Sequence, residues 1–256
     1  MATLPPIGMS ITSNISMPHV VLLDLDGTLL DDSRAEGAVA ATCEWLAASH
    51  PGLDAARLAA ANATAWAEHW PTLEADWMLG RLDSERAGLE LWRRALAVCG
   101  LEDRDLARAV LRKFMELELS AYRLFNDVPL MLEALSNRGI RTAVVTNGAG
   151  DYQRRKLGVL GLDGLAGVAI SGELGVRKPD TRIFEHVLDE LKVDPSDAWH
   201  VGDTLATDVA GAVAAGITSV WVNRKARARG QGDPEPTIEV RSLLELPAHL
   251  DAAHPR

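Results

Sequence analysis

After Asn126 the sequence alternates between helix-like and strand-like segments, and this alternation restricts the fold more than any other feature. Apolar runs rich in β-branched residues predict strands, and apolar residues at helical spacing predict helices. The predicted strands cover residues 141–145, 167–170, 198–201 and 219–222, and the predicted helices cover 129–137, 151–160, 181–191 and 207–215. Strands separated by helices predict an α/β fold with a doubly wound parallel sheet. Ligands of such sheets bind beyond the carboxyl ends of the strands.

An earlier strand, predicted over Val20–Leu23, ends directly on two acids. Asp24 and Asp26 stand two positions apart, so their side chains would share a face in extended backbone. Gly27 follows them and allows the chain to turn close to a ligand. Crowded carboxylates repel each other unless a cation lies between them, which favours a divalent metal ion and an anionic substrate. Such a pair can also divide the chemistry, with one nucleophile and one general acid and base.

Residues 33–125 are rich in alanine and carry apolar residues at helical spacing. The pattern is broken at Pro51-Gly52, Gly80 and Gly100. These breaks predict about four helices, which form a small bundle inserted into an α/β core of residues 19–32 and 126–228. Pro71 lies inside the second helical pattern and should kink or split that helix.

The composition excludes several classes of function. A formal net charge of −10 over 256 residues argues against a nucleic-acid-binding surface and against affinity for anionic membranes. No stretch is long and apolar enough to predict a membrane span. Cys43 and Cys99 lie in apolar, helix-like surroundings, which favours free thiols and a reducing cytoplasm. We expect a flexible N-terminal tail over residues 1–18 and a C-terminal tail over residues 229–256.

Polar residues also follow the other predicted strands or precede a helix. They are Thr146 and Asn147 after one strand, Asp203 and Asp208 after another, and Lys178 ahead of a helix. Together with Asp24 and Asp26 they occupy four separate loops. Turn formation alone does not explain this coincidence, because parallel strands would bring the same loops to one edge of the sheet.

Four motifs occur in order: DLDGT over residues 24–28, VVTNG over 144–148, VRKPD over 176–180 and GDTLATD over 202–208. With this ordered set the chain resembles the haloacid dehalogenase superfamily, in the branch that carries a helical cap after the first motif. The resemblance covers residues 18–224. It implies a Rossmann-like core, with residues 33–125 as the cap that closes over the site.

The resemblance implies hydrolysis of a small phosphomonoester in two steps. Asp24 would attack phosphorus to give an aspartyl phosphate, while Asp26 would protonate the leaving alcohol and then deprotonate water. It also implies a Mg²⁺ ion held by the Asp24 carboxylate, the Asp26 backbone carbonyl and Asp203. Asp208 would orient the metal ligands or Lys178.

The same resemblance assigns the groups around the phosphate. The Thr146 hydroxyl and the backbone N–H groups of Asn147 and Gly148 would bind the phosphoryl oxygens. Lys178 would place a fixed positive charge beside Asp24.

The leaving group is expected to meet the cap, where Trp77, Arg81 and Arg86 are our candidates for substrate contacts. Residues 172–191 resemble sugar-phosphate phosphatases of the N-acylneuraminate type, which makes a sugar phosphate one candidate among small phosphorylated metabolites. Asp26 favours phosphoryl transfer over dehalogenation, because a halide leaves without a proton. The alternatives are a sugar-phosphate mutase and a regulatory binding protein without turnover. Either a monomer or a homodimer is compatible with the sequence.

Overall fold

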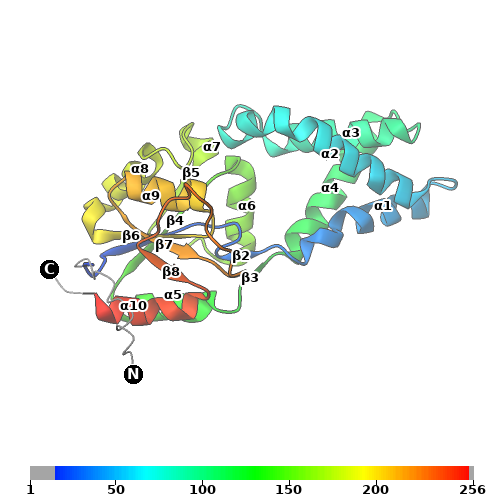
Figure 1. Ribbon diagram of the computed structural model, residues 1–256. Helices are drawn as coiled ribbons and strands as arrows, with labels where there is room; N and C mark the ends of the chain where they lie inside the picture. Colours follow the sequence, from blue (N-terminus) through cyan, green and yellow to red (C-terminus); the bar gives the residue numbers. More distant parts are fainter. Residues whose placement is uncertain (1–14, 254–256) are drawn as a thin grey trace, which may run out of the picture.

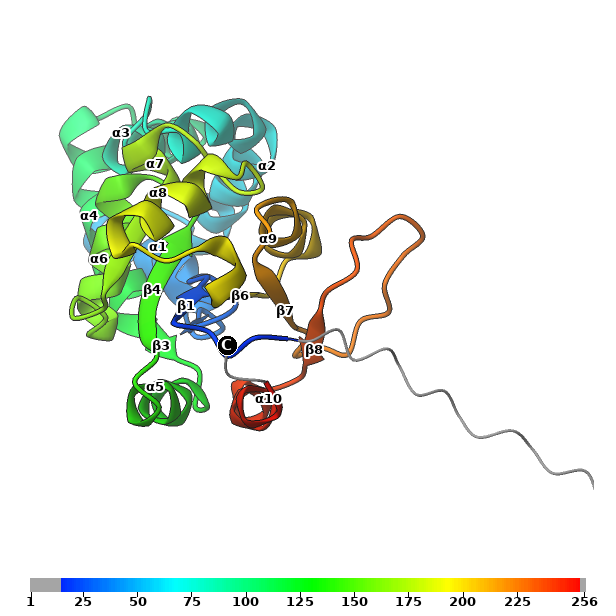
Figure 2. The same ribbon diagram turned by 90° about the vertical axis from the view of Figure 1, so that its left-hand side faces the viewer.

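The computed structural model describes residues 15–253. Within that range, six parallel strands form one sheet in the order β5-β4-β1-β6-β7-β8 (Figure 1, Figure 2). The strands are β1 (Val20–Leu23), β4 (Arg141–Thr146), β5 (Gly167–Ile170), β6 (Ala198–Gly202), β7 (Thr218–Val222) and β8 (Ile238–Val240). β1 lies inside the sheet, paired with β4 on one side and β6 on the other. The predicted parallel α/β sheet is confirmed.

Helices cover both faces of the sheet because alternate residues of its apolar strands enter two separate cores. One core contains Val20 and Leu22 of β1, and the other contains Val21 and Leu23. The helices on the first face are α8 (Arg182–Leu191) and α9 (Ala210–Ala214), and those on the second are α5 (Val128–Asn137) and α10 (Leu246–Ala252) (Figure 1).

Two further helices follow strands at the carboxyl edge of the sheet. α6 (Gly150–Leu160) follows β4, and α7 (Ser171–Leu174) follows β5. The remaining short helical turns are Ala35–Gly37, Pro195–Asp197 and Leu243–Glu245, together with the π-helical turn Leu205–Val209.

Residues between β1 and β4 form a helical segment with its own core. Its helices are α1 (Ala38–Ser49), α2 (Ala55–Met78), α3 (Ser84–Val98) and α4 (Arg104–Ala121). Asp54, Asp83 and Asp103 cap α2, α3 and α4 by accepting backbone N–H groups of the first turn, each cap contributing about 1 kcal/mol. Trp92 is buried at the centre of this segment. α2 runs through Pro71 as one helix, so of the predicted kink or split the split does not occur.

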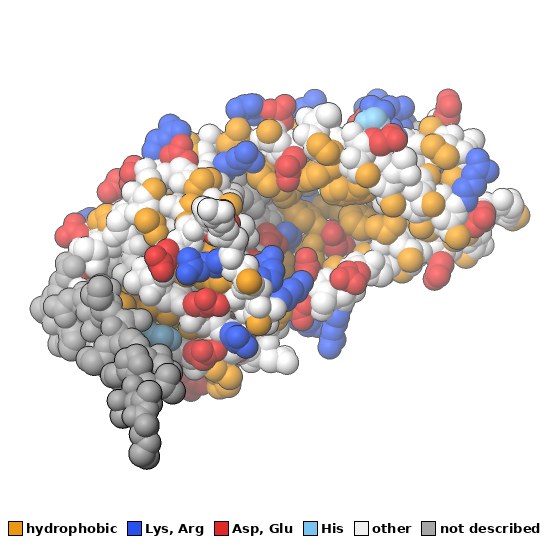
Figure 3. Space-filling view, in the orientation of Figure 1, with side chains coloured by type: hydrophobic (Ala, Val, Ile, Leu, Met, Phe, Trp, Pro, Cys, Tyr) orange, Lys and Arg blue, Asp and Glu red, His pale blue; other side chains and the backbone are white. Residues whose placement is uncertain are grey.

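The helical segment joins the sheet through two adjacent connections. β2 (Leu30–Asp31) enters the segment and pairs antiparallel with β3 (Arg123–Leu124), which leaves it. A second contact forms where the hydroxyl of Ser171 donates to the carbonyl of Met78 at the end of α2, at 2.6 Å. Figure 3 shows a hollow between the sheet and the helical segment, with hydrophobic side chains gathered along it.

The predicted C-terminal tail over residues 229–256 is wrong for most of its length. β8 pairs with β7, and α10 buries Leu246 and Leu250 in the core beside α5. The predicted N-terminal tail lies outside the described residues as far as residue 14; beyond it, Ile15 and Met17 pack against the same core. Among the described residues, no helix has the length and apolarity that a membrane span requires.

Candidate active site

The carboxyl ends of neighbouring strands bring the predicted acids and lysine into direct contact. Asp24 continues beyond β1, and its backbone N–H donates to the carbonyl of Val201 in β6 at 2.9 Å. Asp208 reaches the same edge from the π-helical turn after β6. Lys178 Nζ donates to Oδ1 of Asp24 and to Oδ1 of Asp208, both at 2.6 Å. All three side chains are buried, so these ion pairs are shielded from solvent.

Asp208 serves mainly to hold Lys178. Its Oδ1 also lies 3.0 Å from Nε2 of His200, and its Oδ2 accepts the backbone N–H of Thr204 at 3.0 Å. Burial acts to raise the pKa of Asp208, but Lys178 and His200 outweigh it and leave that pKa below its usual range. Burial likewise acts to lower the pKa of Lys178, and the carboxylates of Asp208 and Asp24 raise it overall. The lysine therefore stays charged and fixed.

The pKa of Asp24 is shifted in the opposite direction to that of Asp208. Burial raises its pKa to about 8, against the opposing effect of Lys178, and the charge of Asp208 adds to the rise. The pKa of Asp203 is also raised, by burial and then by Asp208. Three carboxylates thus share the charge of one lysine, and this edge of the sheet has too little positive charge for all of them to ionise easily.

The donor set fits a hard divalent cation. One carboxylate oxygen from each of Asp24, Asp203 and Asp208 lies within 4.8 Å of the others, and Mg²⁺ prefers such oxygens. Gly27 permits this approach: it has φ +80°, and a Cβ there would lie 2.8 Å from Oδ2 of Asp203. The side chain of Asp26 points elsewhere, which is compatible with the prediction that only its backbone carbonyl would face the metal.

The Asp26 side chain is held by two residues that sequence reasoning missed. Lys156 Nζ donates to Oδ1 of Asp26 at 2.7 Å, and Gln153 Nε2 donates to Oδ2 at 2.8 Å. The amide of Gln153 also donates to the hydroxyl of Thr146 at 2.7 Å. Gln153 and Lys156 stand three positions apart in α6, directly after the TNG motif. That spacing puts them on one helix face, which was the available signal.

The loop after β4 departs in part from its predicted function. The side chain of Asn147 accepts the backbone N–H of Lys178 at 2.8 Å and donates to the carbonyl of Lys178 at 3.1 Å. Asn147 therefore fixes the lysine loop against the β4 loop. The N–H of Gly148 donates to Oγ of Ser171 at 2.9 Å. The N–H group that the sequence assigned to a phosphoryl oxygen therefore has Ser171 as its acceptor in this structure.

Comparison with known proteins identifies the family. A family model described as haloacid dehalogenase-like hydrolase matches residues 18–216, which is most of the chain. The chain belongs to the haloacid dehalogenase-like hydrolase family.

Several members of this family are similar over long stretches. Phosphoserine phosphatase of Thermus thermophilus is 37% identical over 254 residues, covering 89% of this chain and 97% of that protein. N-acylneuraminate-9-phosphatase of Mus musculus is 36% identical over 155 residues, covering 60% of this chain and 62% of that protein. The crystal structure of 2-haloacid dehalogenase from Pseudomonas syringae pv. Tomato DC3000 has a TM-score of 0.67 at 30% identity, covering 92% of this chain and 99% of that one.

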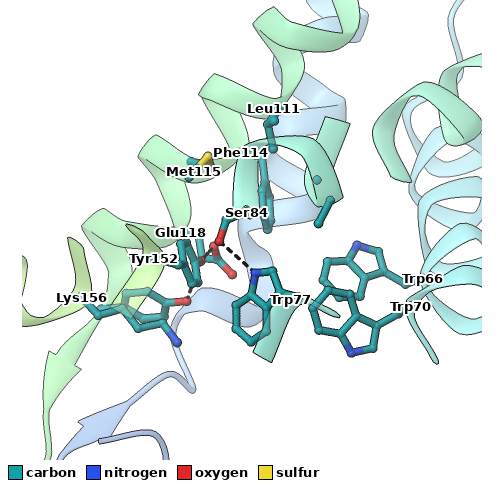
Figure 4. Close-up of a pocket in the computed structure, with 13 residues that line it drawn as sticks. Trp66, Trp70, Trp77, Ser84, Leu111, Phe114, Met115, Glu118, Tyr152 and Lys156 are labelled. Carbon is teal, nitrogen blue, oxygen red and sulfur yellow. Dashed lines mark hydrogen bonds between the residues drawn. The ribbon is translucent and has the colours of Figure 1, made fainter. Parts of the chain in front are cut away.

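In this haloacid dehalogenase-like hydrolase, a cavity of about 210 Å³ opens between the helical segment and α6 (Figure 4). We call it the aromatic pocket. Its lining includes Trp66, Trp70, Trp77, Glu118, Tyr152 and Lys156.

Of the predicted cap contacts, Trp77 alone lies in this pocket. Arg81 is exposed and pairs with Asp76 at 2.8 Å, and Arg86 is exposed in the first turn of α3. Neither arginine lines the pocket.

Proposed function

We propose that this hydrolase cleaves a small phosphate monoester, with Mg²⁺ bound and through an aspartyl-phosphate intermediate. The observation that carries the proposal is that two nearby carboxylates, those of Asp24 and Asp26, are held by different lysines. Lys178 holds Asp24 on the metal side, and Lys156 holds Asp26 on the pocket side. One carboxylate can then act as nucleophile while the other handles protons.

In the first step, an oxygen of Asp24 forms a bond to phosphorus and the bond from phosphorus to the ester oxygen breaks. Asp26 in its acid form gives its proton to the departing oxygen, which leaves as an alcohol. In the second step, Asp26 takes a proton from water, whose oxygen attacks phosphorus and releases inorganic phosphate and the Asp24 carboxylate.

Other groups hold charge and position during both steps. Lys178 keeps a positive charge beside Asp24, and the Thr146 hydroxyl and Asn147 backbone would orient the phosphoryl oxygens. Bound Mg²⁺, held by Asp24, Asp203 and the Asp26 carbonyl, would offset negative charge on the transferring group. The names of two relatives, phosphoserine phosphatase and N-acylneuraminate-9-phosphatase, support phosphate release. Sugar phosphates and amino-acid phosphates both remain candidates at this level.

The similarity to a 2-haloacid dehalogenase raises a second possible reaction. A halide needs no proton when it leaves, so dehalogenation makes no use of an acid held beside the nucleophile. The test is direct: purified protein with Mg²⁺ is offered p-nitrophenyl phosphate, small alkyl phosphates and 2-chloropropionate. We expect inorganic phosphate and no chloride. Chloride release without phosphate release would overturn the proposal, as would no turnover of any phosphate ester.

A reducing cytoplasmic location is also proposed, since Cys43 is a buried free thiol and Cys99 is free as well.

A further inference from the structure

The aromatic pocket adjoins the proposed catalytic groups at two points. Lys156 lines the pocket and donates to Asp26 at 2.7 Å. Trp77 lines it from α2, and a Cβ on Gly148 would lie only 3.1 Å from the outer edge of the Trp77 ring. Because Asp26 is the proposed proton donor to the leaving oxygen, the alcohol attached to that oxygen must lie against this pocket. The pocket is therefore where the leaving group is selected.

Aromatic rings form a continuous wall of the pocket. The ring centroids of Trp66 and Trp70 are 4.7 Å apart, those of Trp70 and Trp77 are 5.3 Å apart, and those of Trp77 and Tyr152 are 6.4 Å apart. In the view of Figure 4, Trp77 is drawn between the other two tryptophans and the group formed by Glu118, Tyr152 and Lys156. The faces of such rings attract cations.

The ammonium group of Lys156 already lies near two aromatic rings of the pocket. Lys156 Nζ lies 4.9 Å from the centroid of the Tyr152 ring and 5.6 Å from that of Tyr122. Both distances are within the range of a cation–π contact, which extends to about 6 Å. The geometry of this wall thus suits alkylammonium groups.

Glu118 gives the pocket a second carboxylate beside that of Asp26, with one lysine between them. Its carboxylate accepts the hydroxyl of Tyr152, which also lies 3.1 Å from the hydroxyl of Tyr122. Burial raises the pKa of Glu118, against the lowering effects of Tyr152 and Lys156. Among the described residues that line the pocket, Lys156 is the cation, and it is paired with Asp26. Two carboxylates therefore share one ammonium group.

Few polar groups remain for a polyhydroxylated ligand. The hydroxyl of Ser84 accepts the indole N–H of Trp77 at 2.9 Å and lies 3.1 Å from Oδ1 of Asp151, to which it donates. The rest of the nearby wall is apolar, including Leu111, Phe114 and Met115. A sugar would leave several hydroxyls without partners there, and each unpaired buried polar group is costly. An alkyl chain that ends in an ammonium group leaves none.

We infer that the leaving alcohol of the substrate carries an ammonium group, which pairs with Glu118 and lies against the rings of Trp77 and Tyr152. The substrate class is thus the phosphate monoester of an amino alcohol. This inference rests on the proposed function and narrows it, because it assigns Glu118 as a specificity-determining residue.

The test compares three phosphate esters of similar size that differ in the charge of the leaving group. They are 2-aminoethyl phosphate, propyl phosphate and 2-phosphoglycolate, which present an ammonium, a methyl and a carboxylate at that position. p-Nitrophenyl phosphate serves as the general phosphatase substrate. We expect kcat/KM for 2-aminoethyl phosphate to exceed that for propyl phosphate by roughly 10- to 100-fold, the range for a charge-assisted hydrogen bond. Phosphoglycolate should be the poorest of the three.

Glu118→Gln should bring the ratio of kcat/KM for 2-aminoethyl phosphate to that for propyl phosphate down to about threefold or less. The matched control is Glu116→Gln on the same helix, since Glu116 is exposed and pairs with Lys113. It should keep the full preference. Circular dichroism and the midpoint of thermal unfolding report whether Glu118→Gln is folded.

The outcomes separate the two claims. Hydrolysis of p-nitrophenyl phosphate with no ammonium preference in the wild type overturns the inference and leaves the proposed function standing. A preference that survives in Glu118→Gln also overturns it. No hydrolysis of any ester overturns the proposed function itself. If Glu118→Gln does not fold, the ranking of the three esters by the wild-type protein decides the inference.

Discussion

Lys156 Nζ lies 2.7 Å from Oδ1 of Asp26, although 130 positions separate the two residues in the chain. The lysine comes from α6, is buried and lines the aromatic pocket, whereas the side chain of Asp26 is 41% exposed. Together with Gln153, which donates to Oδ2 of Asp26, the lysine fixes the orientation of this carboxylate. This contact connects proton transfer with selection of the leaving group.

Replacing Lys156 by methionine should lower kcat/KM for alkyl phosphates by roughly 10- to 100-fold, because a hydrogen bond between charged groups is lost. The fall should appear in kcat more than in KM, since Asp26 acts on the departing oxygen. Arg154→Met is the control: Arg154 is in the same helix, half exposed, and pairs with Glu173 instead. Equal losses in the two variants would show that Lys156 has no special role at Asp26.

Replacing Asp24 and replacing Asp26 should reduce the activity in different ways. Asp24→Asn removes the nucleophile, so activity should fall to background with every ester. Asp26→Asn removes proton transfer, which contributes about 10²- to 10⁴-fold in typical enzymes. An alkyl phosphate should suffer nearly the full loss. An aryl phosphate, whose leaving group needs little help, should still give a rapid burst followed by slow turnover.

Rapid-quench measurement of burst amplitude and steady rate checks this assignment. A burst of product in Asp24→Asn would contradict the role of that residue as nucleophile. Equal first-step losses for aryl and alkyl esters in Asp26→Asn would contradict its role as acid.

Chelation should abolish phosphate release and added Mg²⁺ should restore it, because three carboxylates, two of them buried, converge where one lysine supplies the positive charge. Calcium should replace magnesium poorly, since it takes a larger and looser set of ligands. Mg²⁺ should also raise the midpoint of thermal unfolding, as any ligand of the folded state does. Asp203→Asn should reduce that rise, whereas Asp251→Asn on the surface should not. Full activity in excess chelator would rule out the proposed metal site.

Asp127 should make the free energy of unfolding depend on pH in the acidic range. Its carboxylate accepts hydrogen bonds from Arg224 and from the N–H of Leu243, and so ties the C-terminal segment to the start of α5. Burial acts to raise its pKa, but Arg224 and Leu243 outweigh it, and the folded-state pKa lies below the usual value of 3.8. The stabilisation is therefore present above that value and is lost as the pH falls through the folded-state pKa.

Asp127→Asn should lower the free energy of unfolding at pH 7 by about 2 kcal/mol, because the charge of Arg224 loses its partner. The difference from the wild type should shrink as the pH is lowered from 5 to about 3. Denaturant unfolding at several pH values measures it. Asp251→Asn is again the control, because that carboxylate is 63% exposed in its pair with Arg138. A difference that stays constant over this range would contradict the account.

The sequence by itself determined the parallel sheet and the strand ends at which Asp24, Thr146 and Asp203 lie. Those features are local: apolar runs define strands, and parallel strands bring their carboxyl ends to one edge. The C-terminal segment was missed because β8 is only three residues long and follows a stretch rich in glycine and proline. Its pairing with β7 depends on the edge that the sheet offers, which no local pattern contains.

The tertiary structure alone decided which helix faces meet at the site. Glu118 and Lys156 belong to helices whose sequences show only amphipathic patterns, and a charged residue on such a helix is usually exposed. Packing of α4 against α6 turns both residues toward one pocket, while Arg81 and Arg86 remain in solvent. Charge and residue type were visible in the sequence for all four. Their burial and partners follow from contacts between distant segments, and these decide which of them can recognise a substrate.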